Sequence, residues 1–199
     1  MKRILAIVLT AAALAIALSA CSKNEEETQM KELFDTVCTA DEALERAKKE
    51  NVVVFEGLKC TAGGDVWDAF YRTASREKPA SVLCAYYYTL DPAHVSAELY
   101  EKEKDQYPKL FFSLVEYNGE TFRATTRDCT EKKVDYQETF RYLLHFTGQA
   151  PGQAVYSSYD NYVLVDDRSA TWEGIMEGLY SSRANAGYKH CTVYQNTLD

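Results

Sequence analysis

Apolar residues near the start of the chain recur with the spacing of three and four that is typical of an amphipathic helix. The first such set is Met30, Leu33, Phe34, Val37 and Cys38. Thr39 then stands three residues before Glu42, which is the spacing of a capping box. The pattern therefore predicts one helix up to about residue 38 and a second helix that begins after Thr39.

Three further helices are indicated by the residues that precede them. Gly63-Gly64-Asp65 precedes an amphipathic segment that carries Trp67 and Phe70. Asp91-Pro92 has the N-cap residue and the first-position proline of a short, highly charged helix that continues to about residue 104. Thr171 precedes the last apolar set of this spacing, which is Trp172, Ile175, Met176, Leu179 and Tyr180.

Between these helices, the pattern changes to that of strands. Val52–Phe55 and Ser81–Thr89 are apolar on both sides, which indicates strands that are buried on both faces. Asn118-Gly119 separates two strand-like runs, at 109–117 and 120–129, and predicts a hairpin with a type I′ turn. Further strands are expected at 136–146, at 162–165 and at 191–194. The chain therefore predicts a single α+β domain with a mainly antiparallel sheet, N-terminal helices and interspersed amphipathic helices.

The apolar segment that precedes the first helix has a different character. Lys2 and Arg3 are followed by the apolar run Ile4–Leu18, and Leu18-Ser19-Ala20-Cys21 ends it. This ending resembles the lipobox of bacterial lipoproteins. The resemblance implies that residues 1–20 are a signal peptide and that Cys21 carries lipid such as palmitate. Residues 21–29 would then form a polar tether, and residues 30–199 the folded domain. The protein is then expected at the extracytoplasmic face of the cell membrane, anchored through Cys21.

Two alternatives compete with the lipid anchor. A transmembrane helix over residues 4–20 would span roughly 25 Å, which is shorter than the ~30 Å hydrocarbon core of a bilayer. A conventional cleavage site would instead release a soluble secreted protein. Lipidation is favoured because all four lipobox positions match and because residues 22–29 that follow are a polar tether. Two or three acyl chains would then hold the protein firmly on the membrane.

Two short motifs in the body of the chain resemble those of small uncharacterised lipoproteins of Gram-positive bacteria. The motifs are Tyr87-Tyr88-Thr89 and Tyr117-Asn118-Gly119, and the similarity covers roughly residues 52–129. That family carries no known activity. The resemblance therefore implies the fold class and the envelope location only.

Charge and composition narrow the function classes. The formal net charge is −8, and loss of the signal peptide makes it two units more negative. An acidic protein binds phosphate backbones poorly, so nucleic acid is not an expected partner. The 15 tyrosines are explained by half-buried sheet positions, with a tyrosine-lined recognition surface as the alternative.

The five remaining cysteines give no metal signature. They are Cys38, Cys60, Cys84, Cys129 and Cys191. An odd number leaves at least one thiol unpaired within the chain, and the sequence does not choose among the pairings. Without CxxC or HxxxH spacing, neither a zinc site nor another cofactor is expected.

Basic residues suggest a ligand site on the predicted sheet. Arg123 and Arg127 alternate with apolar residues on one predicted strand, and Arg141 and His145 do so on the next. If the apolar sets face the same way, these four side chains share one surface that could bind a carboxylate, a phosphate or an acidic partner. The alternative is a solvated face on which the arginines pair with Glu or Asp.

Signals for catalysis are weak. Asp166-Asp167 follows a strand and favours turn formation over a paired acid and base, because adjacent strand residues face opposite ways. A distant dyad such as Cys129 with His145 stays open, and the common hydrolase motifs are absent from the sequence. We therefore expect a non-catalytic binding or interaction domain of the cell envelope, with an envelope protein or a small solute as its partner. The alternatives are an envelope hydrolase with unidentified catalytic residues and a purely structural or inhibitory domain.

Overall fold

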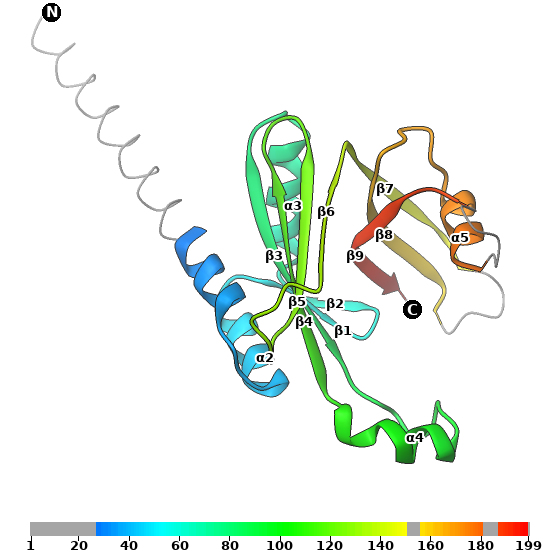
Figure 1. The fold of residues 1–199 in the computed structure, drawn as a ribbon. Helices are drawn as coiled ribbons and strands as arrows, with labels where there is room; N and C mark the ends of the chain where they lie inside the picture. The colour runs from blue at the N-terminus through cyan, green and yellow to red at the C-terminus, as the bar shows by residue number, and fades with distance from the viewer. Residues whose placement is uncertain (1–26, 151–155, 181–186, 199) are drawn as a thin grey trace, which may run out of the picture.

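The computed structural model describes residues 27–150, 156–180 and 187–198 (Figure 1). The predicted signal peptide, Cys21 and most of the tether lie outside these residues. Among the helices that are described, none is long and apolar enough to cross a membrane.

The larger of two sheets has six strands in the order β2-β1-β3-β4-β5-β6. β1 pairs with β3 in parallel, and the other neighbours pair antiparallel. The strands are β1 (Val53–Glu56), β2 (Lys59–Ala62), β3 (Ala80–Tyr88), β4 (Lys109–Tyr117), β5 (Phe122–Asp128) and β6 (Tyr136–Phe140).

The smaller sheet is antiparallel and has the order β7-β8-β9. Its strands are β7 (Tyr142–Gln149), β8 (Ser158–Val165) and β9 (His190–Leu198). A bulge in β9 leaves Val193 without a partner in β8, since Tyr162 pairs with Tyr194 and Val163 pairs with Thr192. The two sheets together confirm the predicted α+β class and the mainly antiparallel pairing.

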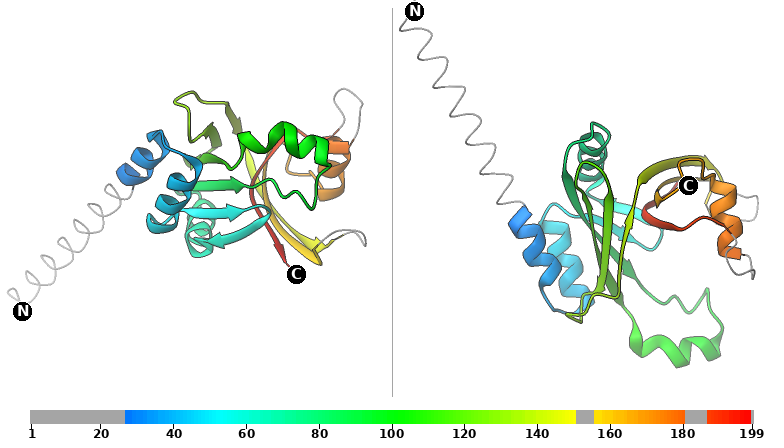
Figure 2. Two further views of the ribbon diagram at one scale, coloured as in Figure 1. Left: turned by 90° about the horizontal axis from the view of Figure 1, so that it is seen from below. Right: turned by 45° about the horizontal axis from the view of Figure 1, so that its top comes forward.

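Four of the described helical segments pack against the sheets, and one does not. They are a helical segment at residues 27–35, α2 (Ala40–Lys49), α3 (Gly64–Ala74), α4 (Ala97–Glu103) with a 3₁₀ turn at Lys104–Gln106, and α5 (Trp172–Tyr180). The segment 27–35 and α2 cover one face of the larger sheet, and α3 and the smaller sheet pack on its other face (Figures 1 and 2). α5 packs on the outer face of the smaller sheet. α4 has no buried residue and projects from the body on the connection between β3 and β4.

Aromatic rings fill the space between the two sheets. The Trp67 ring of α3 lies 4.9 Å from the ring of Tyr194 and 5.2 Å from that of Tyr162. Phe55 of β1 stacks on Tyr86 of β3 at 4.9 Å. This cluster accounts for many of the tyrosines at buried or half-buried positions, as the sheet interpretation expects.

Several local predictions are confirmed. Thr39 and Glu42 form the capping box of α2, with each side chain accepting a bond from the other residue's backbone. Gly63 precedes α3 with a φ of +72°, and a Cβ atom there would lie 2.3 Å from the carbonyl oxygen of Val52. Only glycine fits this position, because the backbone approaches closely and adopts a left-handed conformation. Thr171 caps α5 through the N–H of Gly174.

Two predictions about helix ends are wrong. The first helix ends at residue 35, and Val37, expected on its buried face, is 45% exposed. The charged helix begins at Ala97 with Ser96 as its cap, since Asp91 instead accepts bonds from Ala93 and His94 in a local turn. Asp is as well suited to such a turn as to a cap.

Two predictions about strands also need correction. The stretch 136–146 is not one strand, because it breaks at Arg141 and its halves belong to different sheets. The β4–β5 turn is not of type I′, because only Gly119 has a positive φ while the Asn118 side chain accepts the N–H groups of Glu120 and Thr121. β2 was not predicted, since it alternates too briefly to be distinguished from a loop.

Candidate functional site

The four residues of the predicted basic surface do not come together. Arg127 is buried, with 1% of its surface exposed, on the face of β5 that the N-terminal helices cover. Its guanidinium donates to the backbone carbonyls of Phe34, Thr36, Asp128 and Glu131. Arg127 therefore joins the end of the first helix to the end of β5 and is not available to a ligand.

The other three residues of that surface are exposed but separate. Arg123 donates two hydrogen bonds to the carboxylate of Glu116, at 3.0 and 2.7 Å. This is the pairing expected for a solvated face. Arg141 lies between β6 and β7. His145 lies in the smaller sheet, where its ring stacks on Tyr162 at 4.1 Å and its Nε2 atom lies 2.6 Å from Asp160.

The arrangement of the thiols does not provide a nucleophile and base. Cys129 lies in the cluster under the N-terminal helices, whereas His145 lies on the opposite side of the larger sheet. Within the described part of the chain, no serine or cysteine side chain is hydrogen-bonded to a histidine. Burial raises the pKa of the Cys191 thiol to about 11 and that of Cys129 to about 12, so both are protonated at neutral pH.

The described carboxylates after β8 take part in a turn and in an ion pair. Asp167 accepts the N–H and the hydroxyl of Ser169, which is the expected turn chemistry and lowers the pKa of the carboxyl group. Asp166 lies 3.5 Å from Lys189. Among the residues that the structure describes, no group of three or more His, Cys, Asp or Glu side chains could hold a metal ion.

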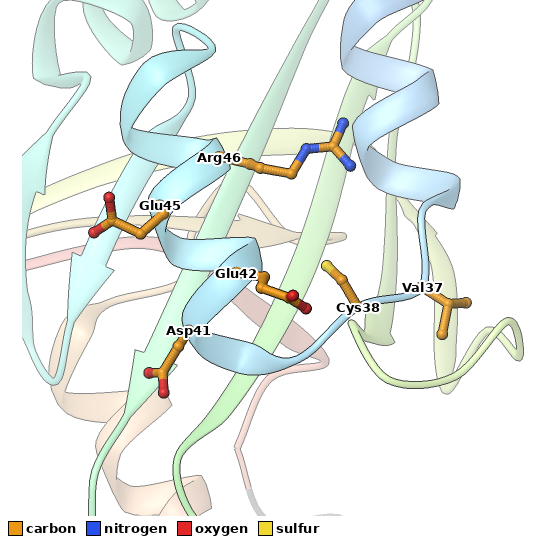
Figure 3. A pocket seen from close by; sticks show the side chains of 6 residues that line it. All are labelled: Val37, Cys38, Asp41, Glu42, Glu45 and Arg46. Carbon is orange, nitrogen blue, oxygen red and sulfur yellow. The ribbon is translucent and has the colours of Figure 1, made fainter.

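An open groove lies between the first helical segment and α2 (Figure 3). It has a volume of about 690 Å³ and is lined by Val37, Cys38, Asp41, Glu42, Glu45 and Arg46. Figure 3 shows Cys38 beside the Glu42 side chain and pointing toward Arg46, while Val37 points away from them. Two of the three carboxylates already serve the fold, because Glu42 closes the capping box and Asp41 accepts a bond of 2.8 Å from the hydroxyl of Tyr87.

A smaller cleft opens where the larger sheet extends beyond the smaller one. It has a volume of about 210 Å³ and is lined by Tyr86, Tyr88, Phe111, Ser113, Thr126, Cys191 and Thr192. Residues on β3, β4 and β5 reach it because Tyr86 pairs with Phe111 and Ser113 pairs with Thr126, which places them on one face. The core between the sheets is built on the other half of these strands, so this end is left partly open.

The cleft combines an aromatic wall with hydroxyl groups and has no charged side chain in its lining. Tyr88 is 37% exposed and lies edge-on to Phe111. Thr126 donates to the buried hydroxyl of Ser113 at 3.0 Å. The hydroxyl of Tyr86 donates a hydrogen bond of 2.8 Å to the carbonyl of Val193 and thereby stabilises the bulge of β9. This lining suits an uncharged group of aromatic or apolar character.

The sequence contains a signal for this cleft in its tyrosines, for which a recognition surface is the alternative to half-buried sheet positions. Tyr86 and Tyr88 are two positions apart on one strand. Period-two alternation places them on the same face, but it cannot show which strands lie beside them. Ser113, Thr126 and Cys191 were missed for that reason.

The expected resemblance to known proteins depends on two short motifs. Tyr87-Tyr88-Thr89 lies at the end of β3, and Tyr117-Asn118-Gly119 lies at the β4–β5 turn. The similarity to Gram-positive lipoproteins that these motifs suggest stays a prediction. No protein-family model, curated protein or solved structure matches this chain.

Proposed function

We propose that the protein is a bacterial lipoprotein, anchored through Cys21 at the extracytoplasmic face of the cell membrane, whose folded domain binds a partner and does not catalyse a reaction. The observation that carries the location is the stretch Leu18-Ser19-Ala20-Cys21, which follows a basic start and an apolar run and precedes a polar segment. Acyl chains on Cys21 would hold the domain close to the bilayer, since the tether is short.

The binding role is supported by the cleft between the two sheets. Its aromatic wall and its uncharged lining favour a small uncharged solute, or an aromatic or apolar side chain of another envelope protein. Hydrolysis is favoured less, because burial raises the pKa of Cys60, Cys84, Cys129 and Cys191 above that of an ordinary thiol. A cysteine hydrolase needs the opposite shift.

The location is tested by metabolic labelling of the full-length protein with palmitate in a bacterial host. We expect label on the native chain and none on Cys21→Ala, because the thioether forms at that sulfur. Cys38→Ala is the matched control and should keep the label. Label that persists on Cys21→Ala, or a native chain that carries none, contradicts the proposal.

The binding role is tested with p-cresol, a small uncharged aromatic probe, by following amide chemical shifts in the full-length protein. Shifts should concentrate at the ends of β3 and β4, and Phe111→Ala should weaken binding by at least about tenfold through loss of ring contact. Val134→Ala, a change at an exposed position outside the cleft, should leave binding unchanged. Shifts that are scattered over the surface and indifferent to Phe111 would refute a binding role for the cleft.

A further inference from the structure

Two cysteines that are far apart in the sequence lie side by side in the fold. Cys38 is in the connection between the first helical segment and α2, and Cys129 directly follows β5. The backbone N–H of Cys38 donates to the carbonyl oxygen of Cys129 at 3.1 Å. Since the bonded N is attached to one Cα and the bonded carbonyl to the other, standard backbone dimensions keep the two Cα atoms within about 6.5 Å of each other. Disulfides span Cα separations of about 4.4 to 6.8 Å.

The environment of the two thiols is also shared. Cys129 is fully buried in the cluster that joins the N-terminal helices to the larger sheet, and Cys38 packs against the same cluster. Burial raises the pKa of the Cys129 thiol, and the nearby charges of Asp128 and of an ionised Cys38 raise it further. A charge on one sulfur affects the other only if the two groups are close.

Arg127 holds the two segments together at the same place. Its guanidinium bonds to the carbonyls of Phe34 and Thr36 on one segment, and to those of Asp128 and Glu131 on the other. The two cysteines are therefore kept near one another by an independent set of contacts. Such preorganisation favours reaction between them over reaction with other thiols.

We propose that Cys38 and Cys129 form an intramolecular disulfide when the protein meets a disulfide oxidant. The bond would tie the first helix covalently to the end of β5. This proposal goes beyond the proposed function, although it suits that function: exported proteins meet oxidising conditions, and the first helix is the part of the domain nearest the predicted tether.

The reaction is a thiol–disulfide exchange that begins at Cys38. Cys38 is half-buried and lines the groove of Figure 3, whereas Cys129 is fully buried. The Cys38 thiolate attacks one sulfur of the oxidant, forms a mixed disulfide and releases one thiol. The sulfur of Cys129 then attacks the sulfur of Cys38, and the Cys129 proton passes to the departing sulfur, which leaves as the second thiol. Two protein thiols are thereby oxidised, and one disulfide of the oxidant is reduced to two thiols.

The test uses the full-length chain with Cys21→Ser, solubilised in detergent, so that it does not depend on lipidation. After incubation with oxidised glutathione, the protein is denatured, alkylated and mapped by mass spectrometry. We expect a linked peptide that contains Cys38 and Cys129, and two fewer alkylated thiols. Cys60→Ser removes another half-buried cysteine and should leave this linkage intact, whereas Cys38→Ser should abolish it.

Thermal unfolding supplies a second measurement that does not require a variant at the buried Cys129. Oxidation should raise the unfolding midpoint of the parent chain by roughly 5 to 15 °C, because the bond closes a loop of roughly 90 residues, and should not raise that of Cys38→Ser. A glutathione adduct that persists on Cys38, a linkage of Cys38 to another cysteine, or an unchanged midpoint would overturn the proposal. A chain that forms the bond but lacks lipid in the labelling experiment would contradict only the proposed location.

Discussion

Replacement of Arg127 by Met tests the role of a buried guanidinium that donates its hydrogen bonds to backbone carbonyls. The guanidinium bonds to four carbonyl oxygens and lies 5.4 Å from the ring of Phe34 and 5.9 Å from that of Phe112. Met fills a similar apolar volume but donates no hydrogen bond. The Arg127→Met chain should therefore retain the packing and lose the bonds between the first helix and β5.

The size of the effect follows from the burial of the acceptors. The carbonyl of Phe34 belongs to a buried residue, so its unmet bond costs about 1 to 3 kcal/mol. The other three carbonyls lie nearer to water, and their lost bonds add about 1 kcal/mol each at most. The sum is about 1 to 6 kcal/mol, which corresponds to a fall in the unfolding midpoint of roughly 2 to 24 °C for a domain of this size.

The assay is urea unfolding of the full-length protein, followed by circular dichroism and by tryptophan fluorescence. Hydrogen exchange of the amides between residues 27 and 39 should become faster, because these residues lose their attachment to the sheet. Arg123→Met is the matched control: its ion pair with Glu116 is exposed, so it should cost less than about 1 kcal/mol. If Arg127→Met is no less stable than Arg123→Met, the assignment of Arg127 as a structural clamp is refuted.

Two further predictions concern the backbone and the pH dependence of stability. Gly63→Ala should lower the free energy of unfolding in urea by more than about 2 kcal/mol, because its Cβ would clash with Val52 and its φ is positive. Gly64→Ala is the control and should change stability by less than about 1 kcal/mol, because open space surrounds Gly64. Equal effects of the two substitutions would contradict the close approach of the backbone at Gly63. Lys48 lowers the pKa of the Glu56 carboxyl group by donating a hydrogen bond to it. The pair therefore stabilises the fold above the ordinary carboxyl pKa and less as the pH falls through the lowered value. A small stability deficit of Glu56→Gln at pH 7 should shrink in urea titrations as the pH is lowered through the carboxyl range; a deficit that does not change with pH would contradict the linkage.

Features that depend on neighbouring residues could be predicted from the sequence. The capping box of Thr39 and Glu42 and the β4–β5 hairpin both rest on contacts between residues close together in the sequence. Both were predicted at the correct place, although the type of the hairpin turn was not. The α+β class follows from the order of such elements along the chain.

The course of the chain at Arg141 depended on the tertiary structure. Phe140, Tyr142, Leu144 and Phe146 stand at alternate positions on both sides of Arg141, so the sequence offers no reason for a break there. In the fold, β6 pairs with β5 while β7 pairs with β8 in the other sheet, and the chain must leave one sheet for the other between them. Which strands pair is decided by the burial of whole faces, which no local pattern encodes.

The same reason explains why the four residues of the predicted basic surface do not come together. Alternation correctly assigned Arg123 and Arg127 to one face of β5, but only the fold shows that a helix covers the part that carries Arg127. The cleft likewise depends on three neighbouring strands and on β9, which approaches from the second sheet. The sequence by itself determined most of the elements and, within a strand, which side chains share a face. The tertiary structure decided which faces are covered, because that depends on contacts between segments far apart in the chain.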